Sequence, residues 1–135
     1  MKKAIVFLAN GFEEMEATGT IDILRRGGVE VTIVTINSSR EVTGAHGMVY
    51  LADQTSAEAD CTTADALVLP GGMPGATNLN ACEPLCELLQ AHYAQEKLVA
   101  AICAAPLVLG GLGFLQGRKA TCYPGFENQL TGATV

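Results

Sequence analysis

Tryptophan is absent from this chain of 135 residues, and aromatic residues make up only 5% of it. Charged residues are sparse as well, at 16%, whereas 49% of the residues are hydrophobic and 15 are glycine. No run of 18 apolar residues occurs, which excludes a transmembrane helix, and the apolar run at residues 4–8 is too short for a signal peptide. This composition is typical of a buried parallel sheet covered by helices. We expect a single domain over residues 1–135, located in the cytoplasm.

Positive charge is also scarce. Eight Lys and Arg residues stand against 14 Asp and Glu residues, which gives a formal net charge of −6. A phosphate backbone would be repelled on average, so we do not expect nucleic acid as a partner. The chain has neither a GxGxxG after a strand nor a GxxxxGK[ST], so no motif indicates nucleotide binding.

The five cysteines contain no CxxC pair, and their odd number does not suggest a disulfide framework. Cys82 and Cys86 are four residues apart and would share one face of a helix. A metal pair there is conceivable, but no His or carboxylate partners stand nearby, so we favour a structural role. We predict no metal ligands and no cofactor.

Strand and helix signals alternate along the chain, as in βαβ units. Short apolar runs predict strands at Lys3–Leu8, Val29–Ile36, Ala64–Leu69 and Leu98–Ile102, a strand beginning at Ala120–Cys122, and a looser strand or hairpin at Val42–Asp53. Helical spacing and end signals predict helices at Glu14–Gly27, Leu79–Tyr93 and Ala104–Leu112. No linker or internal repeat divides these elements.

Three segments with chemical potential follow predicted parallel strands directly. They are Asn10–Glu16, Pro70–Met73 and Ile102–Pro106. Ligands of open α/β sheets bind at the carboxyl ends of the strands, so we expect these segments to meet there.

Cys103 stands in the last of these segments, at a strand-to-helix turn that suggests a nucleophile elbow. A helix N-terminus favours the thiolate, so we expect a lowered thiol pKa. Local sequence alone allows a buried, inert cysteine equally well. The Gly71–Gly72 backbone, together with Ala104, could hold a developing oxyanion. A carboxylate at the start of a helix is favoured by the helix dipole alone, which is one explanation for Glu16. Glu16 would have a role in the chemistry only if it lies beside the Cys103 thiol.

Taken together, these segments resemble the ThiJ/PfpI superfamily, in the branch that contains the Parkinson-disease-associated protein deglycase. The matching stretches are Ala9–Glu16, Ile21–Gly28, Ala66–Gly72 and Ala100–Pro106, in the family's order and spacing. The resemblance implies a flavodoxin-like α/β fold, a three-layer sandwich with a mostly parallel central sheet, and a homodimer.

The resemblance also implies roles for individual residues. Cys103 falls on the family nucleophile, Glu16 on the protonated glutamate that contacts it, and Gly72 and Ala104 on the oxyanion donors. The substrate pocket or its dimer rim would include Glu13, Gly71, Arg26, His46 and Tyr123.

Two departures from the family pattern stand out. Tyr123 occupies the place where many relatives have a histidine, so a Cys-His protease is poorly supported. Family domains also run about 50 residues further. We therefore expect the chain to lack about the last quarter of the fold, which a separate C-terminal fragment could supply.

The resemblance implies a cysteine-dependent, cofactor-independent enzyme of the glyoxalase III or deglycase type, a lyase or hydrolase. Its substrate would be a small reactive carbonyl compound, methylglyoxal or its adducts on protein. The alternative is a redox-sensing stress-response protein in which Cys103 is oxidised without turnover.

Overall fold

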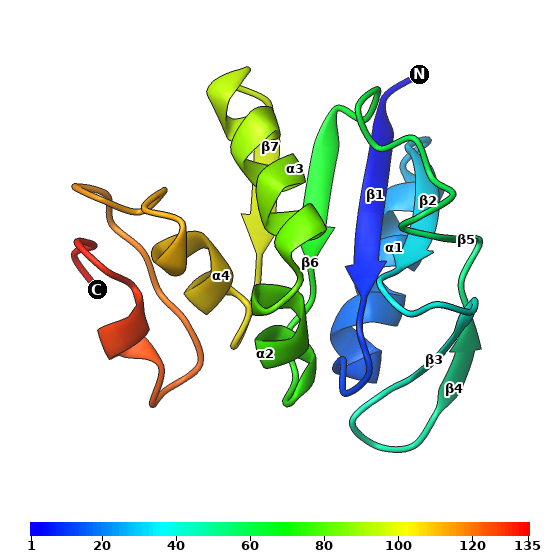
Figure 1. The fold of residues 1–135 in the computed structure, drawn as a ribbon, viewed down its shortest axis with the longest axis horizontal. Coiled ribbons are helices and arrows are strands. Elements are labelled where there is room, and N and C mark those ends of the chain that lie inside the picture. The colour runs from blue at the N-terminus through cyan, green and yellow to red at the C-terminus, as the bar shows by residue number, and fades with distance from the viewer.

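A five-stranded parallel sheet runs through the computed structural model, which describes residues 1–135 (Figure 1). In spatial order its strands are β5 (Gln54–Thr55), β2 (Glu30–Thr35), β1 (Lys3–Leu8), β6 (Ala66–Leu69) and β7 (Leu98–Ala101). The central strand β1 is buried from its second residue to its last, which explains its continuous apolar run. The four main strands predicted from the sequence are confirmed.

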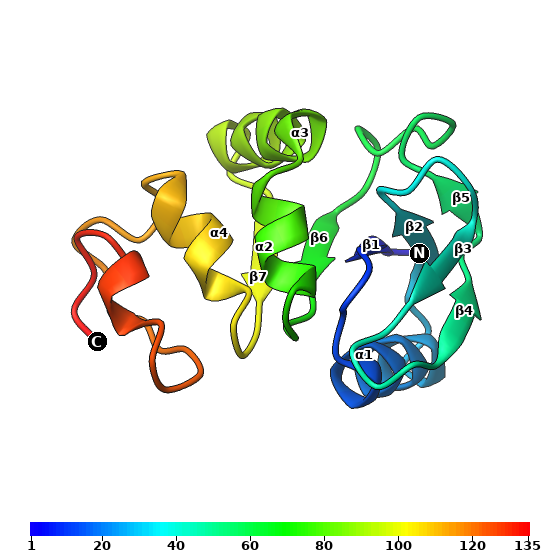
Figure 2. The same cartoon turned by 60° about the horizontal axis from the view of Figure 1, so that its bottom comes forward.

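Helices cover both faces of this sheet, which confirms the three-layer sandwich. Figure 2 shows α1 (Glu14–Arg26) on one side, with α2 (Gly75–Asn80), α3 (Glu83–Ala94) and α4 (Pro106–Gly111) on the other side. Side chains from alternating strand positions form a separate core against each layer. Phe7 and Leu67 belong to the core with α2, α3 and α4, whereas Val6 and Leu8 belong to the core with α1.

Helix α1 follows the predicted range closely because both of its ends have capping signals. The Glu13 carboxylate accepts a hydrogen bond of 2.7 Å from the Glu16 N–H at the N-terminus. Gly27 caps the C-terminus, and Arg25 and Arg26 lie in the last turn, where cations suit the helix dipole.

Two predicted elements differ in the structure. The single helix expected at Leu79–Tyr93 is wrong: α2 ends at Asn80 and α3 begins at Glu83, because Pro84 fits only the first turn of a helix. The strand expected at Ala120–Cys122 is also wrong, since this region forms only an isolated bridge between Lys119 and Thr134. A short 3-10 helix, η1 (Glu127–Gln129), follows.

The looser region at residues 42–53 forms the hairpin that was one of its two predicted forms. Strands β3 (Glu41–Thr43) and β4 (Val49–Leu51) pair antiparallel outside the main sheet. Their connecting turn contains Gly47 at φ +84°, a conformation that favours glycine. This turn packs against the start of α1, where the Ala45 N–H donates to the Phe12 carbonyl at 2.7 Å.

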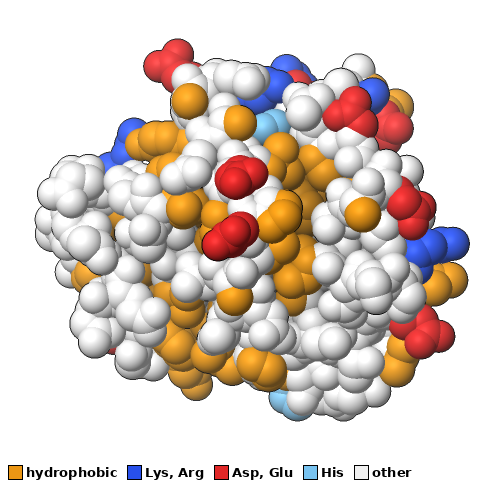
Figure 3. Space-filling model, in the orientation of Figure 1, with side chains coloured by type: hydrophobic (Ala, Val, Ile, Leu, Met, Phe, Trp, Pro, Cys, Tyr) orange, Lys and Arg blue, Asp and Glu red, His pale blue; other side chains and the backbone are white.

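One half of the sheet face beside α1 has no helix over it. Figure 2 shows α1 beneath β1 and β2, with no helix on that side of β6 and β7. A hollow of about 510 Å³ lies there, lined by Leu24, Val68, Leu98 and Ala100 among others. Leu98 is 63% exposed. On the opposite side, Figure 3 shows apolar side chains gathered in a furrow next to α3.

None of the helices has the length and apolar character needed to cross a membrane.

Candidate active site

The three predicted segments meet at the carboxyl ends of β1, β6 and β7, as expected. The Glu13 N–H donates to the Gly71 carbonyl at 2.9 Å, which joins the β1–α1 loop to the β6–α2 loop. The Ile102 N–H donates to the Leu69 carbonyl at 3.3 Å, which joins the β7–α4 turn to the same region. Parallel strands ending at one edge therefore bring together residues far apart in sequence.

Cys103 lies at the turn between β7 and α4 and has φ +65°. A non-glycine residue in this region costs on the order of 1–3 kcal/mol, which the surrounding contacts must offset. The strained elbow predicted for this residue is confirmed. The conformation lifts the thiol out of the sheet edge and leaves it half-buried rather than enclosed in the core.

Glu16 projects from the first turn of α1 toward the same point as the thiol. Its Oε1 accepts a hydrogen bond of 2.8 Å from the Gly71 N–H. A Cβ on Gly71 would lie 2.7 Å from the Cys103 Cβ and 2.8 Å from Glu16 Oε1. Because glycine has no Cβ, the Cys103 side chain and the Glu16 carboxylate can both lie against residue 71.

The thiol pKa of Cys103 is raised above its ordinary value. Burial is the largest cause, and the neighbouring Glu16 raises the pKa further through a hydrogen bond and through its charge. The backbone N–H groups of Ala104 and Gly72 act in the opposite direction, so both predicted oxyanion donors face the sulfur. The expectation of a lowered thiol pKa is wrong, because a six-residue helix contributes less than burial and the adjacent carboxylate.

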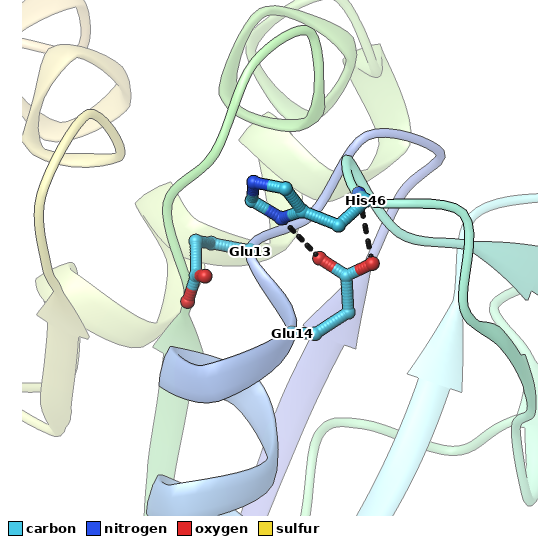
Figure 4. A group of neighbouring side chains, drawn as sticks. All are labelled: Glu13, Glu14 and His46. Atoms are coloured by element: carbon cyan, nitrogen blue, oxygen red, sulfur yellow. Dashed lines mark hydrogen bonds and ion pairs between the residues drawn. The ribbon is translucent and has the colours of Figure 1, made fainter.

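A second cluster stands beside this one, made of Glu13, Glu14 and His46 (Figure 4). Glu14 is buried, and its carboxylate accepts hydrogen bonds from the His46 N–H at 2.8 Å, the Met48 N–H at 3.3 Å and His46 Nδ1 at 3.0 Å. Burial raises the pKa of Glu14, but these hydrogen bonds outweigh it, and the pKa is lowered overall. A carboxylate oxygen of Glu13 lies within 4.8 Å of the other two groups.

Glu14 is the site residue that sequence reasoning missed. Its signal was available, because Glu14, Ala17 and Ile21 are spaced by three and four residues and form the buried face of α1. Gly44 completes the arrangement, since a Cβ there would collide with the Glu14 carboxylate.

Arg26 lies away from the Cys103 thiol, whereas Tyr123 is bonded to the Cys103 backbone. Arg26 is exposed in the last turn of α1, at the opposite end from Glu16, and forms an ion pair of 2.9 Å with Asp22. Within one chain it does not join the cluster, so its place at a dimer rim stays a prediction. The Tyr123 N–H donates to the Cys103 carbonyl at 2.7 Å, while the residue as a whole is 58% exposed.

The family model described as "DJ-1/PfpI family" matches residues 2–135. The chain belongs to the DJ-1/PfpI family. Among curated DJ-1/PfpI relatives, DJ-1 homolog B of Arabidopsis thaliana is 40% identical over 135 residues, which are 99% of this chain and 31% of that protein. A deglycase of Pyrococcus horikoshii is 35% identical over 98% of this chain and 79% of its own length.

Solved structures of the DJ-1/PfpI family agree with this fold. The structure of oxidized Toxoplasma gondii DJ-1 superposes with a TM-score of 0.91 at 41% identity, over 96% of this chain and 71% of that one. The chain spans only about a third of the length of the two Arabidopsis thaliana relatives, DJ-1 homologs A and B.

Proposed function

We propose that this protein is a cofactor-independent enzyme of the glyoxalase III or deglycase type, with Cys103 as nucleophile. The observation that supports it is the strained elbow, which presents the Cys103 thiol to the Glu16 carboxylate and to the N–H groups of Gly72 and Ala104. A nucleophile, a proton carrier and two oxyanion donors are the groups that addition to a carbonyl requires. A deglycase among the relatives fits this assignment.

In the proposed reaction the Cys103 thiolate adds to the aldehyde carbon of methylglyoxal. The carbonyl electrons move to oxygen, where the Gly72 and Ala104 N–H groups stabilise the charge until Glu16 supplies a proton. Glu16 then takes the proton from the former aldehyde carbon and returns it to the adjacent carbon, while the hydroxyl proton moves to the former ketone oxygen, which yields the lactoyl thioester. Water hydrolyses this thioester to lactate and the free thiol, so methylglyoxal and water account for all atoms of the product.

The raised thiol pKa has a function in this scheme. Near neutral pH the thiol holds its proton in the resting state, beside a carboxylate that can receive it when the substrate arrives. Turnover should therefore fall at high pH, where the pair has lost the proton that Glu16 supplies to the substrate oxygen.

Lactate formation from methylglyoxal tests the proposal. We expect the purified protein to form lactate and the Cys103→Ser variant to form none above background. Cys82→Ser is the matched control, since Cys82 lies at the N-terminus of α3 and outside the cluster. Equal activity in the wild type and Cys103→Ser would reject the assignment.

The alternative is a redox sensor, for which a relative described as oxidized is the supporting observation. In that case a peroxide would transfer one oxygen atom to the Cys103 thiolate and give a sulfenic acid hydrogen-bonded by Glu16. A protein that gains 16 Da at Cys103 with dilute peroxide and forms no lactate would favour this alternative.

We further propose a cytoplasmic homodimer that acts on small carbonyl compounds or on their protein adducts. In a dimer the exposed Arg26 could reach the rim of the partner's pocket, as the family resemblance implies. Light scattering of the purified protein measures the oligomeric state directly.

A further inference from the structure

His46 is held in one orientation at the edge of the Cys103 site. Its backbone N–H and its Nδ1 both bond the buried Glu14 carboxylate, so the imidazole cannot rotate without losing a contact. Because a carboxylate accepts, Nδ1 is the protonated nitrogen. Figure 4 shows the other ring nitrogen pointing away from Glu14. The side chain is 72% exposed, so this nitrogen is accessible from solvent.

Glu13 links the imidazole to the thiol. One of its carboxylate oxygens lies within 4.8 Å of the His46 ligand atom, and its N–H bonds the Gly71 carbonyl. Gly71 in turn faces the Cys103 Cβ and Glu16. His46 and Cys103 are therefore connected through two residues, Glu13 and Gly71, at the edge of the sheet from which a ligand would approach the thiol.

Negative charge dominates this approach. Glu13, Glu14 and Glu16 all contribute carboxylates, and no Lys or Arg forms an ion pair with any of them. His46 forms an ion pair with Glu14 when its imidazole is protonated, so its charge is the positive charge within this cluster. Glu13 from the β1–α1 loop and Glu14 from α1 are the titratable groups that face it, since residues 43–48 of the hairpin contain no other.

We propose that His46, clamped by Glu14, selects the charge of the ligand that reaches Cys103. With a neutral imidazole the site accepts neutral or cationic carbonyl compounds and repels anions, whereas a protonated imidazole admits anions as well. The substrate class rests on the proposed function, but the charge selection itself does not require turnover. Histidine is the side chain best suited to change charge near neutral pH, so the pH dependence of ligand entry tests this selection.

A matched pair of alkylating probes tests this proposal. Iodoacetamide is neutral and iodoacetate is anionic, and both react with the same thiolate. The ratio of their rate constants at Cys103, measured by peptide mass spectrometry, therefore cancels the thiolate fraction. We expect the iodoacetate-to-iodoacetamide ratio to fall about five- to tenfold from pH 5.5 to 8.5, the order of magnitude expected when one unit charge is lost near a partly exposed site.

Variants of His46 separate charge from structure. His46→Asn retains a short donor for Glu14 without a titrating charge, so its ratio should be low and independent of pH. His46→Arg should give a high ratio that is equally independent of pH. Lys2→Gln, a charge change at the start of the chain and far from the cluster, should reproduce the wild-type slope.

A wild-type slope that persists in His46→Asn would overturn the proposal, as would a flat wild-type ratio. Circular dichroism of each variant confirms that the fold is retained. A protein that shows the predicted slope but makes no lactate would retain the charge selection and lose the glyoxalase assignment. Lactate formation together with an iodoacetate-to-iodoacetamide ratio that does not change with pH would support the glyoxalase assignment and reject the charge selection.

Discussion

The Gly71 N–H donates a hydrogen bond of 2.8 Å to Glu16 Oε1 and thereby holds that carboxylate beside the thiol of Cys103. The bond joins the end of β6 to the first turn of α1, two elements that are 55 residues apart in the chain. The backbone thus fixes the carboxylate where it can exchange a proton with the sulfur or with a substrate oxygen.

Replacement of Glu16 by Gln should lower the Cys103 pKa and reduce turnover. The carboxylate raises the thiol pKa through its charge and hydrogen bond, so its removal lets the thiolate form at lower pH. Lactate formation should nevertheless fall by about 10²- to 10⁴-fold, because the proton carrier is lost. The pH dependence of iodoacetamide labelling measures the first effect. A midpoint that moves upward would contradict it.

Gly44→Ala should destabilise the protein by about 1–3 kcal/mol, because the new methyl group would collide with the buried Glu14 carboxylate. Gly19→Ala is the matched control: it lies inside α1 with open space around it and should stabilise by up to about 1 kcal/mol. Urea denaturation gives both values. Equal effects of the two substitutions would show that the Gly44 contact does not constrain the hairpin.

Stability should decrease between pH 7 and pH 5 because of His92. Its side chain is buried, Nε2 lies 2.9 Å from the Ala64 carbonyl oxygen, and burial lowers its pKa. Below about pH 6.5 the unfolded chain takes up a proton that the folded state does not, so the free energy of unfolding falls. His92→Gln should be less stable at pH 7 but flatter over this range. A wild-type curve without slope in urea titrations would exclude this role.

Peptidase activity should be negligible. The family resemblance implies that Tyr123 stands where many relatives have a histidine, and a phenol is a poor general base near neutral pH. Tyr123→His should not restore a dyad, since a new ring would also need an orienting partner. Hydrolysis of a fluorogenic peptide by the wild type, lost in Cys103→Ser, would overturn this expectation.

The uncovered sheet face beside α1 should drive association of residues 1–135 when they are produced alone. Leu98, Val68 and Ala100 border an apolar hollow of about 510 Å³, and soluble monomers seldom expose large apolar patches. We propose that another segment or another subunit covers this face in the functional protein. Leu98→Lys should reduce the association seen by light scattering. A monomeric wild-type polypeptide with a cooperative thermal melt would contradict the proposal.

Buried strands were predictable from the sequence because a short, continuous apolar run such as Lys3–Leu8 is typical of a strand covered on both faces of the sheet. The meeting of Glu16, Gly71 and Cys103 was also predictable, since parallel strands place their carboxyl ends at one edge. These inferences need only the order and direction of the strands.

Features that depend on packing in three dimensions were not predictable in the same way. The break between α2 and α3 reflects Pro84 together with the docking of Gly75 against the backbone of Gly11. The direction of the Cys103 pKa shift depends on how deeply the thiol is enclosed, which no local motif specifies. The Glu14–His46 bond joins residues 32 apart through a hairpin whose placement the sequence does not dictate.

The backbone hydrogen bond between the Tyr123 N–H and the Cys103 carbonyl makes position 123 suitable for an optical reporter of the Cys103 site. Tyr123 is attached to the elbow by its N–H, yet the residue is 58% exposed and its ring centroid is 6.4 Å from that of Phe126. Because the chain contains no tryptophan, an indole introduced at 123 would be the sole source of emission excited at the red edge of protein absorbance. Its spectrum would respond to adduct formation, oxidation or ligand entry at the neighbouring sulfur, and could follow each event in real time without a label.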